Sequence, residues 1–357
     1  MNPLRNQNSP SIDDRKSSSL NDDFKFSLHS KYFSRCLTIL PSHTSSLDNS
    51  RVTVAFYSIA GLDILRSLPL SLPYPTTELI SWIYSLQLIT DSSVCGFRGS
   101  SCAISSRTIP NHYDHTHITM TMTALLSLLL LGDNFENVQR DKIASSLARL
   151  QLPTGAFLPT VLSTESDLRF VYCACVVAFI LNDWSGINKD ACTNFILQCQ
   201  TYEYAFGQVP GAEAHGGSTF CAVAALSLMG RLKDFEHQHD LVRWCLQRQT
   251  EGFNGRPSKA DDSCYSWWIG ATLKLCNKEN LINFDENQNF LHATESQVTG
   301  GFSKLPDSSA DPLHSYLSLA SLSLIHHANL KPIHPALIIS MDSVERLETM
   351  LHAKWSR

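Results

Sequence analysis

Apolar residues recur at helical spacing along most of this chain, whereas alternating strand patterns are scarce. The first such stretch begins at Phe24 and ends before Pro41, which stops a helix. Further helices are expected over 50–68 and 76–88, the second opening with a Thr-Thr-Glu sequence that resembles an N-terminal cap. The Ser-rich segment 100–112 is expected to be a loop. The pattern therefore predicts an all-α fold.

A glycine–phenylalanine turn recurs along the chain. Its phenylalanines stand at positions 97, 157, 206, 253 and 302, and the last four are 49, 47 and 49 residues apart. Each turn is followed by a nearly apolar helix and, in the clearest repeats, by a second helix that is apolar on one side only. The nearly apolar helices are expected at 118–131, 168–181, 219–229, 265–275 and 316–325. The one-sided helices are expected at 141–150, 189–198 and 239–247.

This pairing of helices indicates two concentric layers, because a helix that is apolar all round needs shielding and a one-sided helix can provide it. Repeats of about 48 residues with paired helices form either a superhelical solenoid or a closed α/α barrel. In both architectures the repeated turns lie on one face, where loops usually carry function.

Composition narrows the class of protein. Of 357 residues 43% are hydrophobic, and the net charge of −5 argues against general nucleic-acid binding. No apolar run is long enough to cross a membrane, and the first residues lack the apolar centre of a signal peptide. The eleven cysteines lie mostly in apolar runs, which is typical of reduced thiols in a cytoplasmic protein. Residues 1–22 are expected to be a flexible polar tail, and residues 23–357 a single domain.

The short segment after the fourth Gly-Phe turn concentrates reactive side chains. It holds Arg256 and Lys259, then Asp262 and Cys264, and then Tyr265. Cations of this kind suit a phosphate-bearing ligand, and Asp and Cys two residues apart suit a divalent metal. Taken singly, loop cations are usually only solvated, and most Asp-x-Cys pairs bind nothing.

Four motifs, in this order, resemble the β subunit of protein prenyltransferases: His215-Gly-Gly-Ser-Thr-Phe220, Gly255-Arg-Pro-Ser-Lys259, Asp262-Ser-Cys264-Tyr265 and Leu313-His314-Ser-Tyr316. Within that family the chain is most similar to the type I protein geranylgeranyltransferases, through the sequences that begin at Cys95, Arg169 and His215. The resemblance covers about residues 23–340. It implies an α/α barrel around a deep apolar funnel, and a heterodimer with a helical-repeat α subunit.

The resemblance assigns Asp262, Cys264 and His314 as the ligands of one Zn2+ ion. His314 opens the next nearly apolar helix, so a barrel can bring it across to the other two residues. Three protein ligands leave an open coordination position, as in catalytic zinc sites. The cysteine of the substrate would occupy that position as a thiolate.

Beside the metal, the resemblance implies a diphosphate site. Cations and hydrogen-bond donors there oppose the negative charge that grows on a departing diphosphate. By resemblance, Lys304 stands where farnesyltransferases carry an aspartate that helps to hold magnesium. A lysine at this position supplies positive charge directly, so Mg2+ is expected not to be required. The implied site consists of the catalytic residues Lys304 and Tyr265 together with His215, Gly216, Gly217, Arg256 and Lys259.

The isoprenoid chain is expected to lie in the funnel, with Thr53 at its floor. Farnesyltransferases carry a bulky tryptophan there, so the smaller threonine leaves room for one more isoprene unit. By resemblance the funnel is also lined by Arg169, Tyr172, Cys173 and Trp268, although core packing is the commoner role for Thr or Trp. The residues matching the pocket for the peptide substrate are His117, Thr119, Phe170 and Leu313.

The implied function is that of a catalytic β subunit of protein geranylgeranyltransferase type I. It would transfer a geranylgeranyl group from geranylgeranyl diphosphate to the cysteine of a C-terminal C-a-a-X sequence, with Leu or Phe at X, on small GTPases and similar proteins. A farnesyltransferase β subunit, a Rab-type geranylgeranyltransferase and a non-catalytic helical-repeat scaffold are the alternatives. A terpene cyclase of related architecture should carry an acid motif such as D-x-D-D, which the chain lacks.

Overall fold

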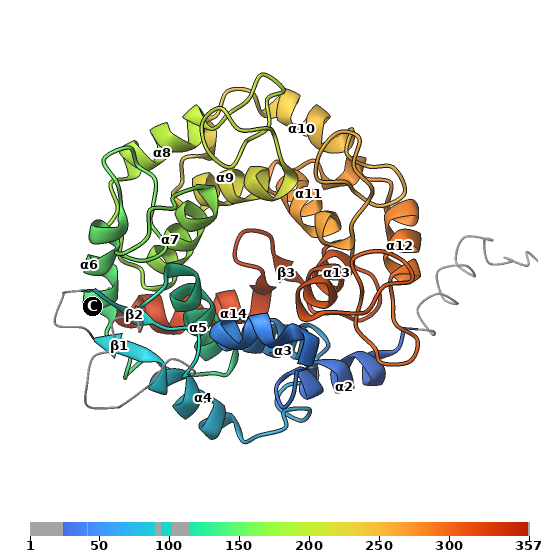
Figure 1. Cartoon of the computed structure of the whole chain (residues 1–357), viewed down its shortest axis with the longest axis horizontal. Coiled ribbons are helices and arrows are strands. Elements are labelled where there is room, and N and C mark those ends of the chain that lie inside the picture. Colours follow the sequence, from blue (N-terminus) through green and yellow to red (C-terminus); the bar gives the residue numbers. More distant parts are fainter. Residues whose placement is uncertain (1–23, 41, 90–93, 102–114, 356–357) are drawn as a thin grey trace, which may run out of the picture.

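The computed structural model describes residues 24–40, 42–89, 94–101 and 115–355. Within them, helices form two concentric rings (Figure 1). The inner ring consists of α3 (Arg51–Ile64), α5 (Ile118–Leu130), α7 (Leu168–Ile180), α9 (Gly216–Leu228), α11 (Ser263–Leu275) and α13 (Pro312–Leu324). The outer ring consists of α2 (Phe26–Cys36), α4 (Thr76–Ser85), α6 (Arg140–Leu150), α8 (Lys189–Gln198), α10 (Gln238–Leu246) and α12 (Phe284–Ala293). The predicted tail at 1–22 and most of the predicted loop at 100–112 lie outside the described residues.

The inner ring is closed, which decides between the two predicted architectures. Each inner helix packs against the next, and α13 packs against α3 to complete the circle (Figure 1). On the outside, His29 of α2 is buried against the last repeat: its Nε2 lies 3.1 Å from Glu295 Oε1, and its Nδ1 accepts a hydrogen bond from Gly301 N–H. The predicted all-α barrel is confirmed, and the solenoid alternative is wrong.

The repeated Gly-Phe turns fix the two rings to each other. All five phenylalanines are fully buried, and each pairs through its backbone with a Gln or Glu that follows an outer helix. The side chains of three of these glutamines also reach the start of the next outer helix, where each accepts from a backbone N–H and donates to a carbonyl. They are Gln87, Gln151 and Gln249.

The predicted helices are present, but several of their ends are wrong. Helix α3 stops at Ile64 instead of 68, because the backbone of Arg66 turns into the left-handed region at a φ of 58°. Helix α4 has Pro75 at its N-cap and no side-chain cap, contrary to the expected Thr-Thr-Glu cap. It also ends at Ser85, so that residues 87–89 are free to form a strand.

Helices α9 and α13 begin three and four residues before their predicted starts of 219 and 316. The predicted starts, Thr219 and Tyr316, passed over the small residues and the proline with which these helices begin. In the structure the start is set by the N-cap side chains of His215 and Asp311, which precede small residues or proline. Helix α12 and the helical segment that follows residue 340 were not predicted.

Four short strands also occur in the described residues, although the sequence shows little alternation. Strand β1 (Gln87–Ile89) pairs antiparallel with β2 (Cys95–Phe97), with Leu88 opposite Gly96. Strand β3 (Ile333–His334) pairs antiparallel with β4 (Ile339–Ser340), and this hairpin points into the centre of the ring (Figure 1). Strands of two or three residues are too short to show in the sequence the alternation of apolar and polar residues that identifies a strand.

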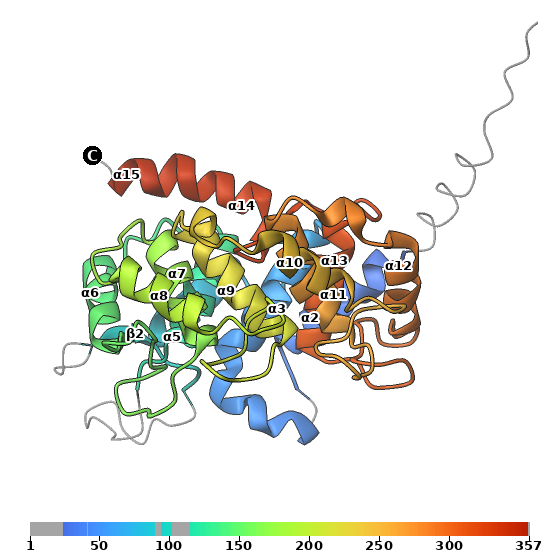
Figure 2. The same ribbon diagram turned by 90° about the horizontal axis from the view of Figure 1, so that it is seen from above.

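The C-terminal segment lies along one face of the ring. Helices α14 (Met341–Arg346) and α15 (Ala353–Trp355), joined by the π-helical turn η4 (Leu347–His352), lie along that face (Figure 2). The remaining short elements are the 3-10 helices η1 (Ser42–Ser50), η2 (Leu232–Asp234) and η3 (Glu279–Leu281). In the described part of the chain no helix has the length and apolarity needed to span a membrane. The ten cysteines described there are all free thiols, and nine are buried, as predicted.

Candidate active site

Five inner helices begin with a residue whose side chain caps the first turn. Each cap accepts a hydrogen bond from a backbone N–H that has no partner within the helix. Because the inner helices run in the same direction, their positive dipole ends gather at one face of the ring, and this favours an anionic ligand there. The capping residues are His117 on α5, Asp167 on α7, His215 on α9, Asp262 on α11 and Asp311 on α13.

The three predicted metal ligands come together between α11 and α13. Asp262, Cys264 and His314 each offer one ligand atom, and these atoms all lie within 4.8 Å of one another. The Oδ1 atom of Asp262 accepts from Cys264 N–H at 3.0 Å and lies 3.3 Å from Nε2 of His314. The cluster therefore joins residues from two successive repeats.

Asp311 orients the imidazole of His314. Its Oδ1 accepts from the backbone N–H of His314 at 3.0 Å, and its Oδ2 lies 2.6 Å from Nδ1 of the same residue. This leaves Nε2 directed at the cluster. A carboxylate on the far nitrogen of a histidine is the usual second-layer partner of a metal ligand.

The pKa values of His314 and Cys264 are also consistent with a cation at the cluster. Burial lowers the pKa of His314, but the hydrogen bonds to Asp262 and Asp311 outweigh this effect and raise the pKa to about 9. Burial, with the nearby carboxylate of Asp262, raises the pKa of the Cys264 thiol far above its usual value. Without a cation both groups therefore carry protons, and binding a metal would release them. A carboxylate, a thiol and an imidazole with this geometry fit a zinc ion.

Next to the metal ligands, Tyr265 meets His215 across two inner helices. The Tyr265 hydroxyl lies 2.8 Å from His215 Nε2, and Nδ1 of His215 accepts from Gly217 N–H at 3.1 Å. Burial, followed by the charge of Arg256, lowers the pKa of His215, so the ring is neutral and its one proton sits on Nε2. That proton is donated to the oxygen of Tyr265, which leaves the phenolic hydrogen free for a ligand.

Two glycines allow this contact. A Cβ atom on Gly255 would stand 2.2 Å from Cζ of the Tyr265 ring, and one on Gly216 would stand 2.8 Å from Cδ1 of Ile269. Any larger residue at Gly255 would displace the phenol. The glycines of the predicted motifs therefore position Tyr265 beside the start of α9.

The predicted loop cations differ in their surroundings. Arg256 Nη1 donates to Glu213 Oε2 at 2.7 Å, and both side chains are about half exposed. Lys259 is exposed, and among the described residues no hydrogen bond or ion pair joins its ammonium group to another side chain. The Lys304 Nζ atom lies 3.6 Å from Asp262 Oδ2, so this cation lies beside the metal cluster.

The residues predicted to line the funnel lie on the inner helices, but they differ in how deeply they are buried. Thr53 is half-buried on α3, and its Oγ1 lies 3.2 Å from Met120 Sδ. Cys173 lies 3.4 Å from Thr119 Oγ1 across α5 and α7. Trp268 is half-buried, with its ring 5.0 Å from that of Phe220, whereas the neighbouring Trp267 is fully buried. Tyr172 is nearly buried, and its hydroxyl donates to the carbonyl of Ala336.

The predicted peptide residues form a smaller group. His117 and Phe170 meet edge to face, with ring centroids 6.0 Å apart, and Nδ1 of His117 accepts from Thr119 N–H. Leu313 is half-buried on α13. Arg169, predicted for the funnel, is exposed and pairs with Asp167, at 2.7 Å between Nη2 and Oδ2. The structure thus places Arg169 at the face of the ring where the inner helices begin, which we call the N-terminal face.

Sequence reasoning missed Asp311, Glu213 and Asp167. A visible signal existed for Asp167, which directly precedes the predicted apolar helix at 168–181, where Asp is a preferred cap. Asp311 stands five residues before the predicted start at 316, and its role as a cap follows only from the observed start of α13 at Pro312. The pairing of Glu213 with Arg256 had no such signal, because the two residues are far apart in sequence and belong to different repeats.

Comparison with known proteins agrees with the fold. A model of the prenyltransferase alpha-alpha toroid domain matches residues 24–339. The chain is 37% identical to the geranylgeranyl transferase type-1 subunit beta of Dictyostelium discoideum, over 87% of the chain and 93% of that protein. It is 34% identical to the subunit of the same name from Arabidopsis thaliana, over 90% of each.

A solved structure is similar as well. The Candida albicans protein geranylgeranyltransferase-I complexed with GGPP superposes with a TM-score of 0.84 at 28% identity, covering 92% of this chain and 99% of that one. The fold, the matched length and the converging site residues all point the same way. The chain belongs to the prenyltransferase alpha-alpha toroid family.

Proposed function

We propose that this chain is the catalytic β subunit of a type I protein geranylgeranyltransferase. It transfers the geranylgeranyl group of geranylgeranyl diphosphate to the cysteine of a C-terminal C-a-a-X sequence with Leu or Phe at X. The two named relatives at 37% and 34% identity support the type I assignment. Residues 23–357 form the catalytic domain in this proposal.

One observation carries the proposal: the metal cluster and the diphosphate residues adjoin. Cys264 and Tyr265 are consecutive on α11, so the cluster with His314 and the pair with His215 share one helix turn. A reaction that joins a thiol to the carbon bearing a diphosphate needs these two sites side by side.

On the nucleophile side, Asp262, Cys264 and His314 would hold one Zn2+ ion. When bound, zinc lowers the pKa of a coordinating thiol, so that the substrate cysteine is a thiolate at neutral pH. The role of Asp311 is to hold the His314 ring so that Nε2 remains directed at the cluster.

On the leaving-group side, the neutral His215 frees the Tyr265 hydroxyl hydrogen to donate to the diphosphate. Arg256 exchanges Glu213 for the diphosphate, and Lys259 approaches from the exposed loop. Gly216 and Gly217 form the first turn of α9, and its positive dipole end favours the diphosphate although their N–H groups already donate to Gly255 O and His215 Nδ1.

Lys304 supplies the charge that a magnesium ion would otherwise provide. Its side chain is 58% exposed and its Nζ lies 3.6 Å from Asp262, so the ammonium can move from the metal cluster toward the diphosphate. Turnover is therefore independent of Mg2+ in this proposal.

The isoprenoid lies along Thr53, Tyr172, Cys173 and Trp268 in the interior, with Arg169 at its entrance. His117, Thr119, Phe170 and Leu313 receive the end of the peptide; since Nδ1 of His117 accepts from the backbone, its Nε2–H is free to donate. The catalytic form is a cytoplasmic heterodimer with an α subunit, and its protein substrates are C-a-a-X-ending small GTPases.

The test is co-expression with the α subunit of a type I relative, followed by transfer assays. Farnesyl and geranylgeranyl diphosphates are each paired with C-a-a-L and C-a-a-S peptides. The highest kcat/KM is expected for geranylgeranyl diphosphate with C-a-a-L, without added Mg2+. A preference for farnesyl diphosphate and C-a-a-S would instead identify a farnesyltransferase subunit. Purified heterodimer without bound zinc or transfer activity would indicate a non-catalytic scaffold.

A further inference from the structure

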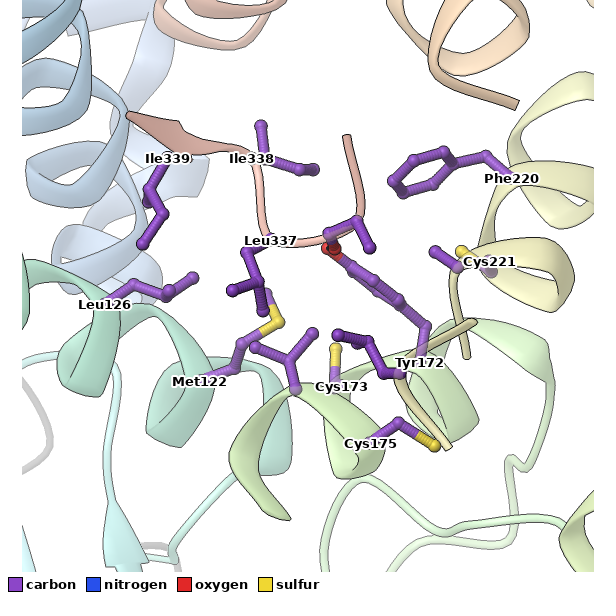
Figure 3. Close-up of a cluster of buried hydrophobic side chains, with 14 of the residues drawn as sticks. Met122, Leu126, Tyr172, Cys173, Cys175, Phe220, Cys221, Leu337, Ile338 and Ile339 are labelled. Carbon is purple, nitrogen blue, oxygen red and sulfur yellow. The ribbon is translucent and has the colours of Figure 1, made fainter. Parts of the chain in front are cut away.

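The hairpin at the centre of the ring occupies the end of the interior opposite the candidate active site. We call residues Ile333–Ser340 the barrel plug; they comprise β3, β4 and the turn between them. In Figure 3 the turn lies among side chains of the inner helices, and Leu337 is directed toward Met122 and Cys173. Cys173 is itself predicted to line the funnel, and Met122 lies within one helical turn of Thr119 on α5.

Exposure falls along the interior until it reaches the plug. On α5, Thr119 and Met120 are half-buried, whereas Met122 is 8% exposed. On α7, Cys173 is 4% exposed and touches Thr119. Leu337 is 0% exposed. An apolar chain that enters from the N-terminal face therefore passes Thr119 and Cys173 before it meets Leu337.

The tip of the plug is held by two tyrosines of the inner ring. Tyr172 of α7 donates its hydroxyl to the carbonyl of Ala336 at 2.8 Å, and Tyr316 of α13 donates to the carbonyl of Ile338. Both hydroxyl groups are buried with apolar neighbours, where an unpaired carbonyl would be costly. The tyrosines therefore fix the position of the tip between them.

The turn itself is shaped by His334. Its Nδ1 accepts from the N–H groups of Ala336 and Leu337 at 3.2 and 3.1 Å. Burial lowers the pKa of His334 to about 4, so the ring is neutral and able to accept. Ile338, which is β-branched, is held in the left-handed region at a φ of 54°, a conformation that such residues rarely adopt. A turn held in this way keeps its shape when a ligand presses on it.

The base of the plug is fixed to α3. Lys331 Nζ lies 2.7 Å from Oδ1 of the buried Asp63, and Ser340 donates its hydroxyl to the other oxygen of that carboxylate. The Lys331 N–H also donates to the carbonyl of Ile64 at the end of α3. The plug is thus held at base and tip by three inner helices.

We propose that the barrel plug terminates the isoprenoid channel and that Leu337 at its tip limits the length of the isoprenoid that binds. This rests on the proposed function and adds a second determinant to Thr53. Thr53 lies in the first turn of α3, close to the N-terminal face, whereas Leu337 is at the tip of the plug, which enters the ring from the opposite end. In this arrangement Thr53 governs the width available to the fourth isoprene unit, and Leu337 excludes a fifth.

The experiment measures binding and transfer separately in the heterodimer. Calorimetry gives the Kd of isoprenoid diphosphates with three, four and five isoprene units for the wild type and for Leu337→Ala. Removing the tip side chain should strengthen binding of the five-unit diphosphate relative to the four-unit one by roughly tenfold or more. Leu337→Val, which removes less volume, should give a smaller shift in the same direction and serves if the alanine variant does not fold.

Leu291→Ala is the matched control. Leu291 is also fully buried, but on the outer helix α12, so its loss should leave the ratio of affinities unchanged. Tyr316→Phe removes only the hydroxyl that holds the tip and should shift the ratio in the direction of Leu337→Ala. An unchanged ratio in both Leu337 variants, or an equal shift in Leu291→Ala, overturns the proposal. Absence of transfer to a C-a-a-L peptide overturns the proposed function alone, because chain-length selectivity is measured by binding.

Discussion

The carboxylate of Asp311 offers a direct test of the metal site, because it touches a ligand without being one. Its two oxygens have separate roles: Oδ1 caps α13 by accepting from His314 N–H, and Oδ2 holds His314 Nδ1 at 2.6 Å. Asp311→Asn keeps the first role, since an asparagine oxygen is an equally good cap. It removes the negative charge from the contact with His314 Nδ1. The variant therefore separates metal binding from helix stability.

The expected magnitude follows from the two roles. Loss of a second-layer carboxylate costs about 10- to 100-fold in metal affinity, which corresponds to roughly 1.4–2.7 kcal/mol. Loss of an N-cap costs about 1 kcal/mol of folding stability. Asp311→Asn should therefore weaken zinc binding with a smaller loss of unfolding free energy in the metal-free protein than Asp311→Ala, because it keeps the cap and loses only the charged hydrogen bond to His314. Asp311→Ala should lower both quantities.

The assay is competition for zinc between the heterodimer and a chromophoric chelator, with urea unfolding in EDTA as the stability measurement. Asp167→Asn is the matched control, because it makes the same change at the N-cap of α7, away from the cluster. Wild-type zinc affinity in Asp311→Asn would refute the reasoning. So would an equal loss of affinity in Asp167→Asn, which would show a general effect of charge at this face.

Four further outcomes are expected. Cys264→Ala should lose zinc and transfer activity while still binding the isoprenoid diphosphate; retained turnover would exclude the zinc role. Thr53→Trp should raise kcat/KM for farnesyl relative to geranylgeranyl diphosphate, and an unchanged ratio would show that Thr53 does not limit the chain. Lys304→Ala should lower kcat by roughly two to three orders of magnitude, as for the loss of one group that stabilises the developing charge. Wild-type turnover should not respond to Mg2+, and a wild-type kcat in the variant would exclude this role. Burial raises the pKa of Glu295, but hydrogen bonds from His29 and His292 outweigh this effect and lower the pKa from 4.5 to about 2. The contribution of Glu295 to stability is therefore full above pH 4.5 and is lost as the pH falls toward 2. Glu295→Gln should reduce the slope of unfolding free energy against pH in that window, and an unchanged slope would contradict the pairing.

The repeat was predictable because one side chain marks it each time. The phenylalanine of every Gly-Phe turn is fully buried, and so its spacing in the sequence is the spacing of the structural units. Helix ends were less predictable, since apolar periodicity does not register small residues such as Gly216 or a proline such as Pro312 at the start of a helix. Caps, which determine those starts, are single residues without a period.

Closure of the ring was beyond the sequence pattern for a different reason. It depends on contacts between the first and last parts of the chain, such as His29 with Glu295, and periodicity within a repeat carries no information about them. The barrel plug was missed for the same reason. Its strands are two residues long, and its shape is imposed by Tyr172 and Tyr316, which read in the sequence only as aromatic residues of core helices.

The metal site was found because Asp262 and Cys264 are neighbours in the sequence and His314 was known by resemblance. The structure adds why these positions can serve both folding and chemistry. A capping side chain has two polar atoms, and the helix uses only one. In His215, Nδ1 is bound to the backbone and Nε2 to Tyr265; in Asp311, Oδ1 caps α13 and Oδ2 holds His314. The repeat thus supplies a second polar atom at the cap of each of five inner helices, all at a single face, and the choice of His or Asp at each cap determines what that atom can bind.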